Sequence, residues 1–358
     1  MKFSPLQLSF VMVLFIGISG HVIIIPHILT VALRDSWICT FIAYVVLILW
    51  GMMICYTMSR MGNQKLFDWA KERAGALVSG IIVFLFFIYI LFMGTTSFYD
   101  LIQSVKIYFL PNTPTFIVAL CFLLLCLGAS NGGLKTVVYF SVVLLPIVWI
   151  LAIFVASATI KAQDYTYLFP VFIHGYVPIL KGTAVMLSGN ADLLVLLLLR
   201  HKLIKSYSMV HTLVLVTILV GLLMVLLLGS ISSFGPNVAA SLRFPALEQW
   251  RLATLGSYLT HLDFLAVFQL LAGTTIRVAF CFILLYDLLE LCSKKMAQIG
   301  KYVTPALFFS TIFIKSDMWV LSFTETYVYP YLFIFAFFIS IFLLAISFMP
   351  VRKGAKIT

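Results

Sequence analysis

Two short interruptions inside long apolar runs of this sequence have the residue types to bind a small charged molecule. Gly17-Ile18-Ser19-Gly20 interrupts the first run, and Ser188-Gly189-Asn190 interrupts the sixth. A broken helix in lipid must satisfy its freed backbone groups, so such a break is expected to line a cavity. The helix end before a break presents carbonyls, which suit an ammonium, and the helix start after it presents N–H groups, which suit a carboxylate. The two interruptions therefore predict a site for a small zwitterion.

The candidate ligand-binding residues lie at these two interruptions and beside them. His21 opens the half-helix after the first interruption and is expected either to contact the ligand or to pack. Phe98 and Tyr99 end the third run and are candidate walls of the cavity, although aromatic side chains also pack or face lipid. The alternative for the glycines and serines is a surface for close helix packing. The complete candidate set is Gly17, Ile18, Ser19, Gly20, His21, Phe98, Tyr99, Ser188, Gly189 and Asn190.

Two of the charged residues within the apolar runs are candidates for an ion pair. Asp192 follows the second interruption, and Arg277 lies midway along the eighth run. Charges inside a membrane are functional by default and need a partner, so we expect these two to pair. Asp192 is a candidate coupling or proton-binding carboxylate. Its structural alternative is an acid in the first turn of the second half-helix, with Asn190 as the N-cap.

The composition identifies the elements that must position these residues. The chain has 358 residues, of which 63% are hydrophobic and 10% are charged, against about 25% charged in soluble domains. Runs of about 20 apolar residues recur along its length, as in helical membrane proteins. We therefore expect one all-α transmembrane domain over residues 1–358. The net charge of +11 is assigned to loops on one side of the membrane rather than to nucleic-acid binding.

The apolar runs predict ten membrane-spanning helices, with an interfacial helix within residues 59–75. No catalytic motif, no metal or cofactor site and no disulfide framework is indicated, and the protein is not expected to be an enzyme. The expected spans are residues 6–33, 38–58, 77–99, 115–127, 136–159, 175–199, 206–228, 264–291, 302–314 and 327–348.

Ten spans place both termini on the same side of the membrane. Fifteen of the 23 Lys and Arg residues then fall on that side and seven on the other, so both termini are expected to be cytoplasmic. The two broken spans are the first and the sixth, and this odd offset gives the two halves opposite orientations. The pattern predicts a 5+5 inverted repeat, with one repeat over about 6–160 and the other over about 168–350.

The full length of the chain also resembles a known family. It is similar to the B subunit of GerA-type spore germinant receptors, which belong to the amino acid–polyamine–organocation superfamily of transporters. The stretches that carry the resemblance are 6–8, 17–26, Asp35-Ser36-Trp37, Phe109-Leu110-Pro111-Asn112-Thr113-Pro114, Tyr167-Leu168-Phe169-Pro170-Val171 with Gly175 and Pro178, and Phe244-Pro245-Ala246-Leu247-Glu248.

The resemblance implies a LeuT-type fold and a permease-like protein of the spore inner membrane or bacterial cell membrane. Such a protein would sense a nutrient, typically an amino acid, together with an A subunit and a lipoprotein C subunit. The alternative is a secondary transporter that moves an amino acid with H⁺ or Na⁺. A third possibility is a structural subunit whose cavity no longer binds a ligand.

Overall fold

The first apolar run forms two helices instead of one. The computed structural model describes residues 2–18, 24–254, 262–314 and 317–351. Helix α1 is Pro5–Ile18 and α2 is Ile25–Ala32. Pro26 lies in the first turn of α2, where a missing N–H leaves no helical hydrogen bond unmade. The expected break in the first span is therefore bounded on both sides by regular helix.

Five further helices complete the first half of the chain. They are α3 (Ser36–Met61), α4 (Leu66–Ala74), α5 (Ala76–Tyr108), α6 (Thr115–Asn131) and α7 (Gly133–Ala158). Gly62 and Gly75 stand at the two ends of the α4 segment with φ of 63° and 98°, a conformation that glycine adopts without steric penalty. Helix α5, the third expected span, ends nine residues later than expected, so Phe98 and Tyr99 lie within it.

The second half begins with a broken span of its own. Helix α8 (Val177–Gly189) is followed by a 3₁₀ segment, Ala191–Val195, and by the short helix α9 (Leu196–Leu199). The remaining elements are α10 (Met209–Phe234), α11 (Pro236–Ser241), α12 (Pro245–Leu252), α13 (Phe264–Cys292), α14 (Lys294–Ser310), α15 (Asp317–Phe323), a π-helical turn (Thr324–Val328) and α16 (Tyr329–Phe348). Helix α14, which corresponds to the ninth expected span, starts at Lys294, eight residues before the expected start at 302.

Within the described residues, seven helical stretches are long and apolar enough to cross a membrane. Two shorter apolar helices, Pro5–Gly17 and α6, accompany them. Large apolar side chains on the outer faces of the long helices remain exposed, such as Phe41 at 56% and Leu49 at 62% on α3. A continuous exposed apolar face suits lipid contact. The protein is thus an all-helical integral membrane protein in its described part. The seven stretches are Ile25–Met61, α5, α7, Val177–Lys202, α10, α13 and Thr326–Phe348.

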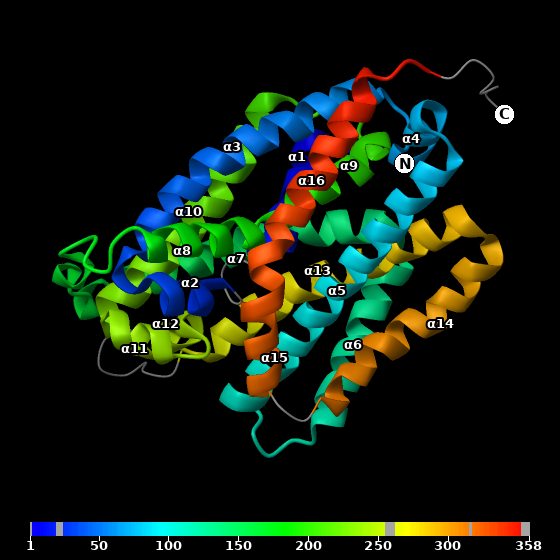
Figure 1. Cartoon of the computed structure of the whole chain (residues 1–358). Helices are drawn as coiled ribbons and strands as arrows, with labels where there is room; N and C mark the ends of the chain where they lie inside the picture. Colours follow the sequence, from blue (N-terminus) through cyan, green and yellow to red (C-terminus); the bar gives the residue numbers. More distant parts are fainter. Residues whose placement is uncertain (1, 19–23, 255–261, 315–316, 352–358) are drawn as a thin grey trace.

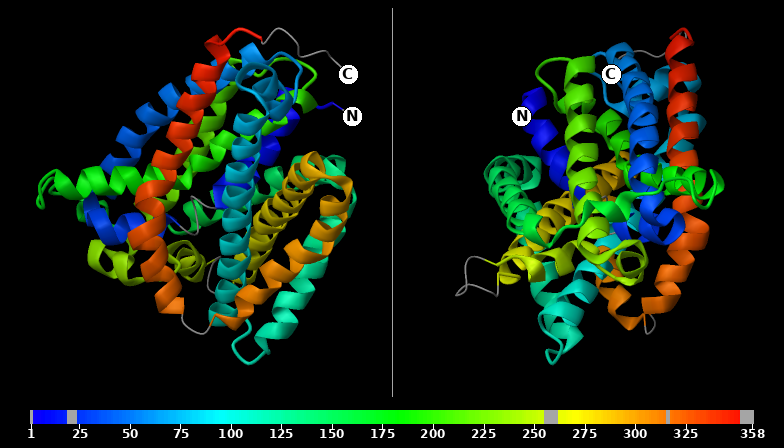
Figure 2. Two further views of the ribbon diagram at one scale, coloured as in Figure 1. Left: turned by 45° about the vertical axis from the view of Figure 1, so that its right-hand side comes forward. Right: turned by 90° about the vertical axis from the view of Figure 1, so that its left-hand side faces the viewer.

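Helix α13 is central to the packing. It contacts α5, α14, α1, α6 and α7, while α3 packs on α10 and α8. Figure 1 shows α3 and α10 on one flank of the bundle, with α5, α6, α13 and α14 on the other. In Figure 2, α8 lies across the direction of α16. Helices α1 and α8 therefore end in the interior, between the two flanks.

The turn between α2 and α3 is tied to the connection that precedes α8. Arg34 Nη1 donates to the carbonyl of Phe169 at 2.7 Å, and the buried Asp35 carboxylate accepts from the backbone N–H of Phe172 at 3.2 Å. These hydrogen bonds join residues in or next to two of the stretches that carry the family resemblance, and they tie the end of α2 to the connection before α8.

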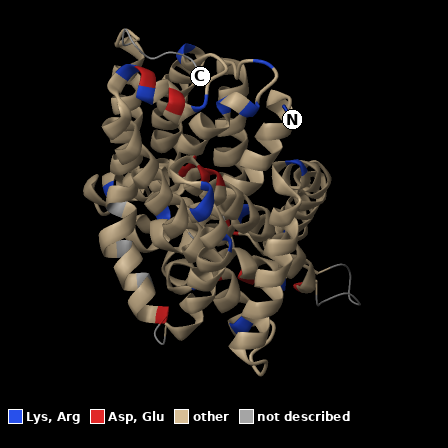
Figure 3. Cartoon of the chain, turned by 90° about the vertical axis from the view of Figure 1, so that its right-hand side faces the viewer, with Lys and Arg blue, Asp and Glu red and all other residues tan. Residues whose placement is uncertain are grey.

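Charged residues are distributed unevenly along the bundle. Figure 3 shows several Lys and Arg residues gathered at the end where the N- and C-terminal marks lie. This distribution is the one that the alternation of the expected spans produces. The orientation of that end toward the cytoplasm remains a prediction.

Candidate functional site

The start of α2, which follows the first break, lies against the end of α8, which precedes the second. Helix α2 packs on α8, and a Cβ added at Gly189 would lie 2.5 Å from Cγ1 of Ile24. Carbon atoms cannot approach that closely, so glycine is required at the end of α8 for α2 to begin where it does. The contact between Gly189 and the Ile24 side chain therefore fixes the start of α2 beside the end of α8.

We predict that Gly189→Leu lowers the free energy of unfolding by about 1–3 kcal/mol, since overpacked interiors must rearrange. Thermal denaturation of the purified protein in detergent measures this. Gly221→Leu on α10 is the matched control, because no atom lies within 4 Å of a Cβ added there. An unchanged midpoint for Gly189→Leu would contradict the close contact. The smaller variant Gly189→Ala tests the same contact, because adding Ile24→Ala, which shortens the opposing side chain, should recover the stability that Gly189→Ala loses.

The residues after α8 take the positions that the structural alternative expected. Asn190 stands at the N-cap position of the segment after α8, and Asp192 lies in the first turn of that segment. The Asn190 side chain makes no capping hydrogen bond, because its Nδ2 donates back to the carbonyl of Met186 at 3.1 Å, which is also short of partners at the end of α8. The first five residues of the second half, including Asp192, are 3₁₀ rather than α-helical.

A fully buried ion pair joins this segment to α13. Arg277 Nη1 lies 2.7 Å from Oδ2 of Asp192, and both side chains are 0% exposed. The hydroxyl of Tyr89 on α5 donates to Oδ1 of Asp192 at 2.7 Å. The structure thus brings together the two charged residues that the sequence predicts to pair, and Tyr89 is an additional partner.

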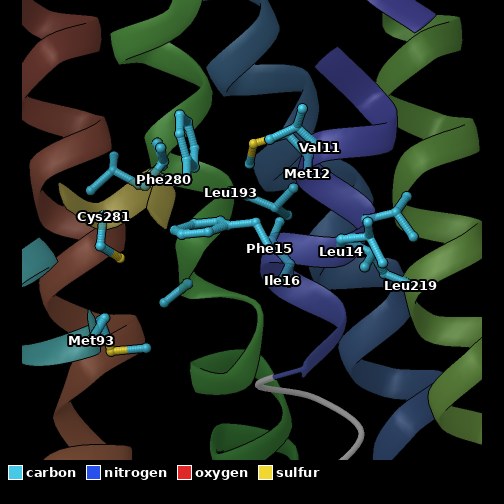
Figure 4. Close-up of a cluster of buried hydrophobic side chains, with 14 of the residues drawn as sticks. Val11, Met12, Leu14, Phe15, Ile16, Met93, Leu193, Leu219, Phe280 and Cys281 are labelled. Atoms are coloured by element: carbon cyan, nitrogen blue, oxygen red, sulfur yellow. The ribbon is translucent and has the colours of Figure 1, made fainter. Parts of the chain in front are cut away.

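Arg277 also holds the end of α1. Its Nη1 donates to the carbonyl of Phe15, its Nε donates to Oγ of Ser97 at 2.6 Å, and its guanidinium lies 4.7 Å from the centroid of the Phe15 ring. Figure 4 shows Phe15 in α1, with its ring directed toward Phe280, whose ring centroid is 5.1 Å away. A cation at a helix C-terminus complements the helix dipole. Arg277 therefore links α1, α5, α13 and the segment after α8.

The space between the breaks and their neighbours is closed. A cavity of about 10 Å³ lies between α5, α8 and the start of α16, which is the room that one water needs. Ser188 closes it further, because its hydroxyl donates to the carbonyl of Tyr329. The wall opposite Gly189 comes from the π-helical turn, through Thr324 and Val328. π-Helical turns are common at functional sites, and this one was not predicted from the sequence.

The remaining candidate residues are dispersed. Gly17 lies near the end of α1 and lines a larger cavity of about 540 Å³. Phe98 stacks on Phe122 and contacts Phe308, so it packs between helices and lines neither of these two cavities. Tyr99 is buried, and its hydroxyl has no hydrogen-bond partner among the described residues. The backbone of Ile18 ends α1, whereas Ser19, Gly20 and His21 lie outside the described residues.

A second charged network was not foreseen. Arg243, in the connection between α11 and α12, contacts Asp100 of α5 at 3.1 Å and both carboxylate oxygens of Asp317 at 3.2 and 3.3 Å. Burial alone would lower the pKa of Arg243, but the two carboxylates raise it above its ordinary value. The guanidinium also lies 4.5 Å from the centroid of the Phe244 ring. This network, hereafter the Arg243 latch, ties α5 and α15 to the α11–α12 connection.

Comparison with known proteins gives consistent matches. A family model described as spore germination protein matches residues 2–320. Spore germination protein XB of Bacillus anthracis is 31% identical over 289 residues, which cover 81% of each chain. Spore germination protein GerQB of Bacillus cereus is 28% identical over 154 residues, which cover 42% of this chain and 41% of that protein. The family match includes both helix breaks, the buried ion pair and the Arg243 latch.

Proposed function

Because the chain belongs to the spore germination protein family, we propose that it is the nutrient-sensing membrane subunit of a spore germinant receptor. The nutrient is an amino acid, and it binds where the first and sixth spans are interrupted. The fold is a ten-helix 5+5 inverted repeat of the LeuT type, in which α1 with α2, and α8 with α9, are the paired broken helices.

The observation that supports this proposal is the contact, in the interior, between the start of α2 and the end of α8. Ile24 packs against Gly189, and Arg277 bridges the end of α1 to the segment after α8. Broken helices that cross at a common level form the substrate site of inverted-repeat transporters. Close packing by small residues would explain Gly189 but would not require a buried arginine at the end of α1.

The chemistry of this region suits a zwitterion. The carbonyls at the end of α1 attract an ammonium. Arg277 Nη2 is buried and has no hydrogen-bond partner among the described residues. An unsatisfied buried donor is unfavourable, and a nutrient carboxylate would supply its acceptor. Arg277 therefore has a double role, as the partner of Asp192 and as a donor to the ligand.

Binding requires the site to open, because only about 10 Å³ is present between α5, α8 and the start of α16. A ligand shifts a conformational equilibrium when it binds one state more tightly than the other. The nutrient would thus stabilise a conformation in which this space is wider. The change would pass to an A subunit and a lipoprotein C subunit in the spore inner membrane, with the termini of this chain in the cytoplasm.

Coupled transport of an amino acid with H⁺ or Na⁺ would use the same cavity. Asp192 is the natural coupling carboxylate in that alternative, but it already has Arg277 and Tyr89 as partners. A neutralised, hydrogen-bonded carboxylate binds a cation poorly compared with a free one. This pairing favours the sensing function.

A deletion of the gene in its native host separates the two functions. Germination is scored as dipicolinate release across a panel of amino acids and sugars, and nutrient uptake by growing cells is measured in parallel. The sensing function predicts that germination in response to one set of amino acids is lost while uptake is unchanged. Normal germination with impaired uptake of one amino acid would refute it and leave a transporter.

A further inference from the structure

The larger cavity, of about 540 Å³, is separate from the closed space and shares no lining residue with it. Its walls come from α1, α7, α10 and α13, and α12 also contributes to it through Leu247 and Trp250. This volume is within the range of about 300–1,000 Å³ that is usual for small-molecule sites. Gly17 lies in its wall, so the cavity reaches the end of α1 at the first helix break.

The lining of this cavity selects against charged groups. It contains no Asp, Glu, Lys, Arg or His among the described residues. Leucine, isoleucine, valine and alanine side chains predominate, with Trp149, Tyr165 and Trp250 as the aromatic members. A charged ligand group would lose its hydration here without a partner. The cavity therefore suits an apolar or aromatic group.

Two of the three glutamine side chains in the wall add free hydrogen-bond acceptors, whereas Oε1 of the third, Gln163, already accepts from the Tyr165 hydroxyl. Gln249 Nε2 donates to the carbonyl of Leu226 at 2.7 Å and to Oγ of Ser230 at 2.6 Å, which uses both of its hydrogens. No described residue donates to Oε1 of Gln249 or of Gln269. Lipid tails have no donor for these oxygens, whereas an indole N–H or a phenol O–H does. The acceptors favour a nutrient side chain over an acyl chain.

We propose that this cavity holds the side chain of the nutrient, and that the nutrient is an amino acid with a large apolar or aromatic side chain. The inference rests on the proposed function, because the ammonium and carboxylate of that amino acid bind at the helix break beside Gly17. The side chain then extends between α7, α10 and α13, beneath α12. Small, acidic and basic amino acids bind weakly, since they either leave the cavity empty or bury a charge in it.

The test is equilibrium binding to the full chain in nanodiscs of defined lipid, with L-leucine, L-phenylalanine, L-tryptophan, glycine, L-aspartate and L-lysine as probes. Ala152→Phe fills the cavity from α7, where Ala152 is half-buried. Ile150→Phe is the matched control, because Ile150 is 66% exposed on the same helix and does not line the cavity. We expect Ala152→Phe to weaken binding of the large side chains by about tenfold to a hundredfold, and Ile150→Phe to leave it unchanged.

The outcomes distinguish this inference from the proposed function. Preference for the large apolar probes, lost in Ala152→Phe while glycine binding is retained, supports it and shows that the variant is folded. Binding of amino acids with no such preference, or with no effect of Ala152→Phe, overturns the side-chain site and leaves the proposed function intact. A lipid that occupies the cavity in native mass spectrometry and that no amino acid displaces also overturns it. No binding of any amino acid overturns both.

Discussion

Asp192→Asn is expected to destabilise the protein by about 3–5 kcal/mol and to abolish the response to nutrient. The substitution leaves the Arg277 charge without its ion-pair partner at a position with 0% exposure, and an unpaired buried charge is strongly unfavourable. Thermal denaturation of the purified chain measures the first effect, and dipicolinate release from spores measures the second. Arg277→Gln should act similarly and should also free the Phe15 carbonyl at the end of α1.

A double variant separates stability from function in this pair. Asp192→Leu with Arg277→Met removes both charges, and buried pairs replaced by apolar residues often retain stability. We expect this protein to fold with a near-normal denaturation midpoint but to give no germination, because the arginine donor beside the helix break is gone. Normal germination by the double variant would show that the ion pair is only structural.

Arg243→Ala is expected to open the closed region between α5, α8 and α16. Without the arginine, Asp100 and Asp317 lose their shared partner, and two nearby carboxylates repel each other. Thr96 lines the closed space, so Thr96→Cys in a background without native cysteines reports its accessibility to a membrane-impermeant thiol reagent. We predict that Arg243→Ala raises the labelling rate about tenfold, the equivalent of about 1.4 kcal/mol.

The same variant should germinate at about tenfold lower nutrient concentration, since a larger fraction of the protein is already open. Arg251→Ala is the control. Arg251 pairs with Glu248 near Arg243 in the chain but is 48% exposed, and such pairs contribute little. Equal labelling rates in Arg243→Ala and in the wild-type background would show that the Arg243 latch does not hold the region closed.

The sequence was sufficient to locate the helix breaks and the central ion pair. Glycine and polar residues inside an apolar run have few explanations in lipid, and α1 and α8 do end at Ile18 and Gly189. Arg277 and Asp192 were expected to pair because a charge in a membrane interior must have a partner and few candidates exist. Strong physical constraints on rare residues made these features predictable.

Helix lengths were predicted less well, for an identifiable reason. Helix α5 continues past Tyr99 to Tyr108 through Asp100 and Lys106, and α14 begins at Lys294. An apolar window ends where polar residues begin, but a helix continues for as long as its backbone hydrogen bonds are favourable. The boundaries of a membrane-spanning run therefore underestimate the helix, and Phe98 lies in the helix interior instead of at its end.

The Arg243 latch and the π-helical turn could not be predicted from periodicity. Arg243 follows a short helix in a connection, and its partners Asp100 and Asp317 are far from it in the sequence. Which distant segments meet depends on how α11, α12 and α15 pack on the bundle. The sequence offered one signal for this network: Asp100 directly follows the third expected span, and a carboxylate that becomes buried needs a cation as its partner.

The measurement that tests the central claim most directly is saturable binding of labelled amino acids to the purified chain in nanodiscs, compared between wild type, Gly189→Leu and Gly221→Leu. Ligand binding between the two helix breaks predicts saturable binding to wild type and to Gly221→Leu. It also predicts the loss of binding in Gly189→Leu, assayed at a temperature at which that variant remains folded. Equal binding by all three proteins would place the nutrient elsewhere and contradict a site at the paired breaks.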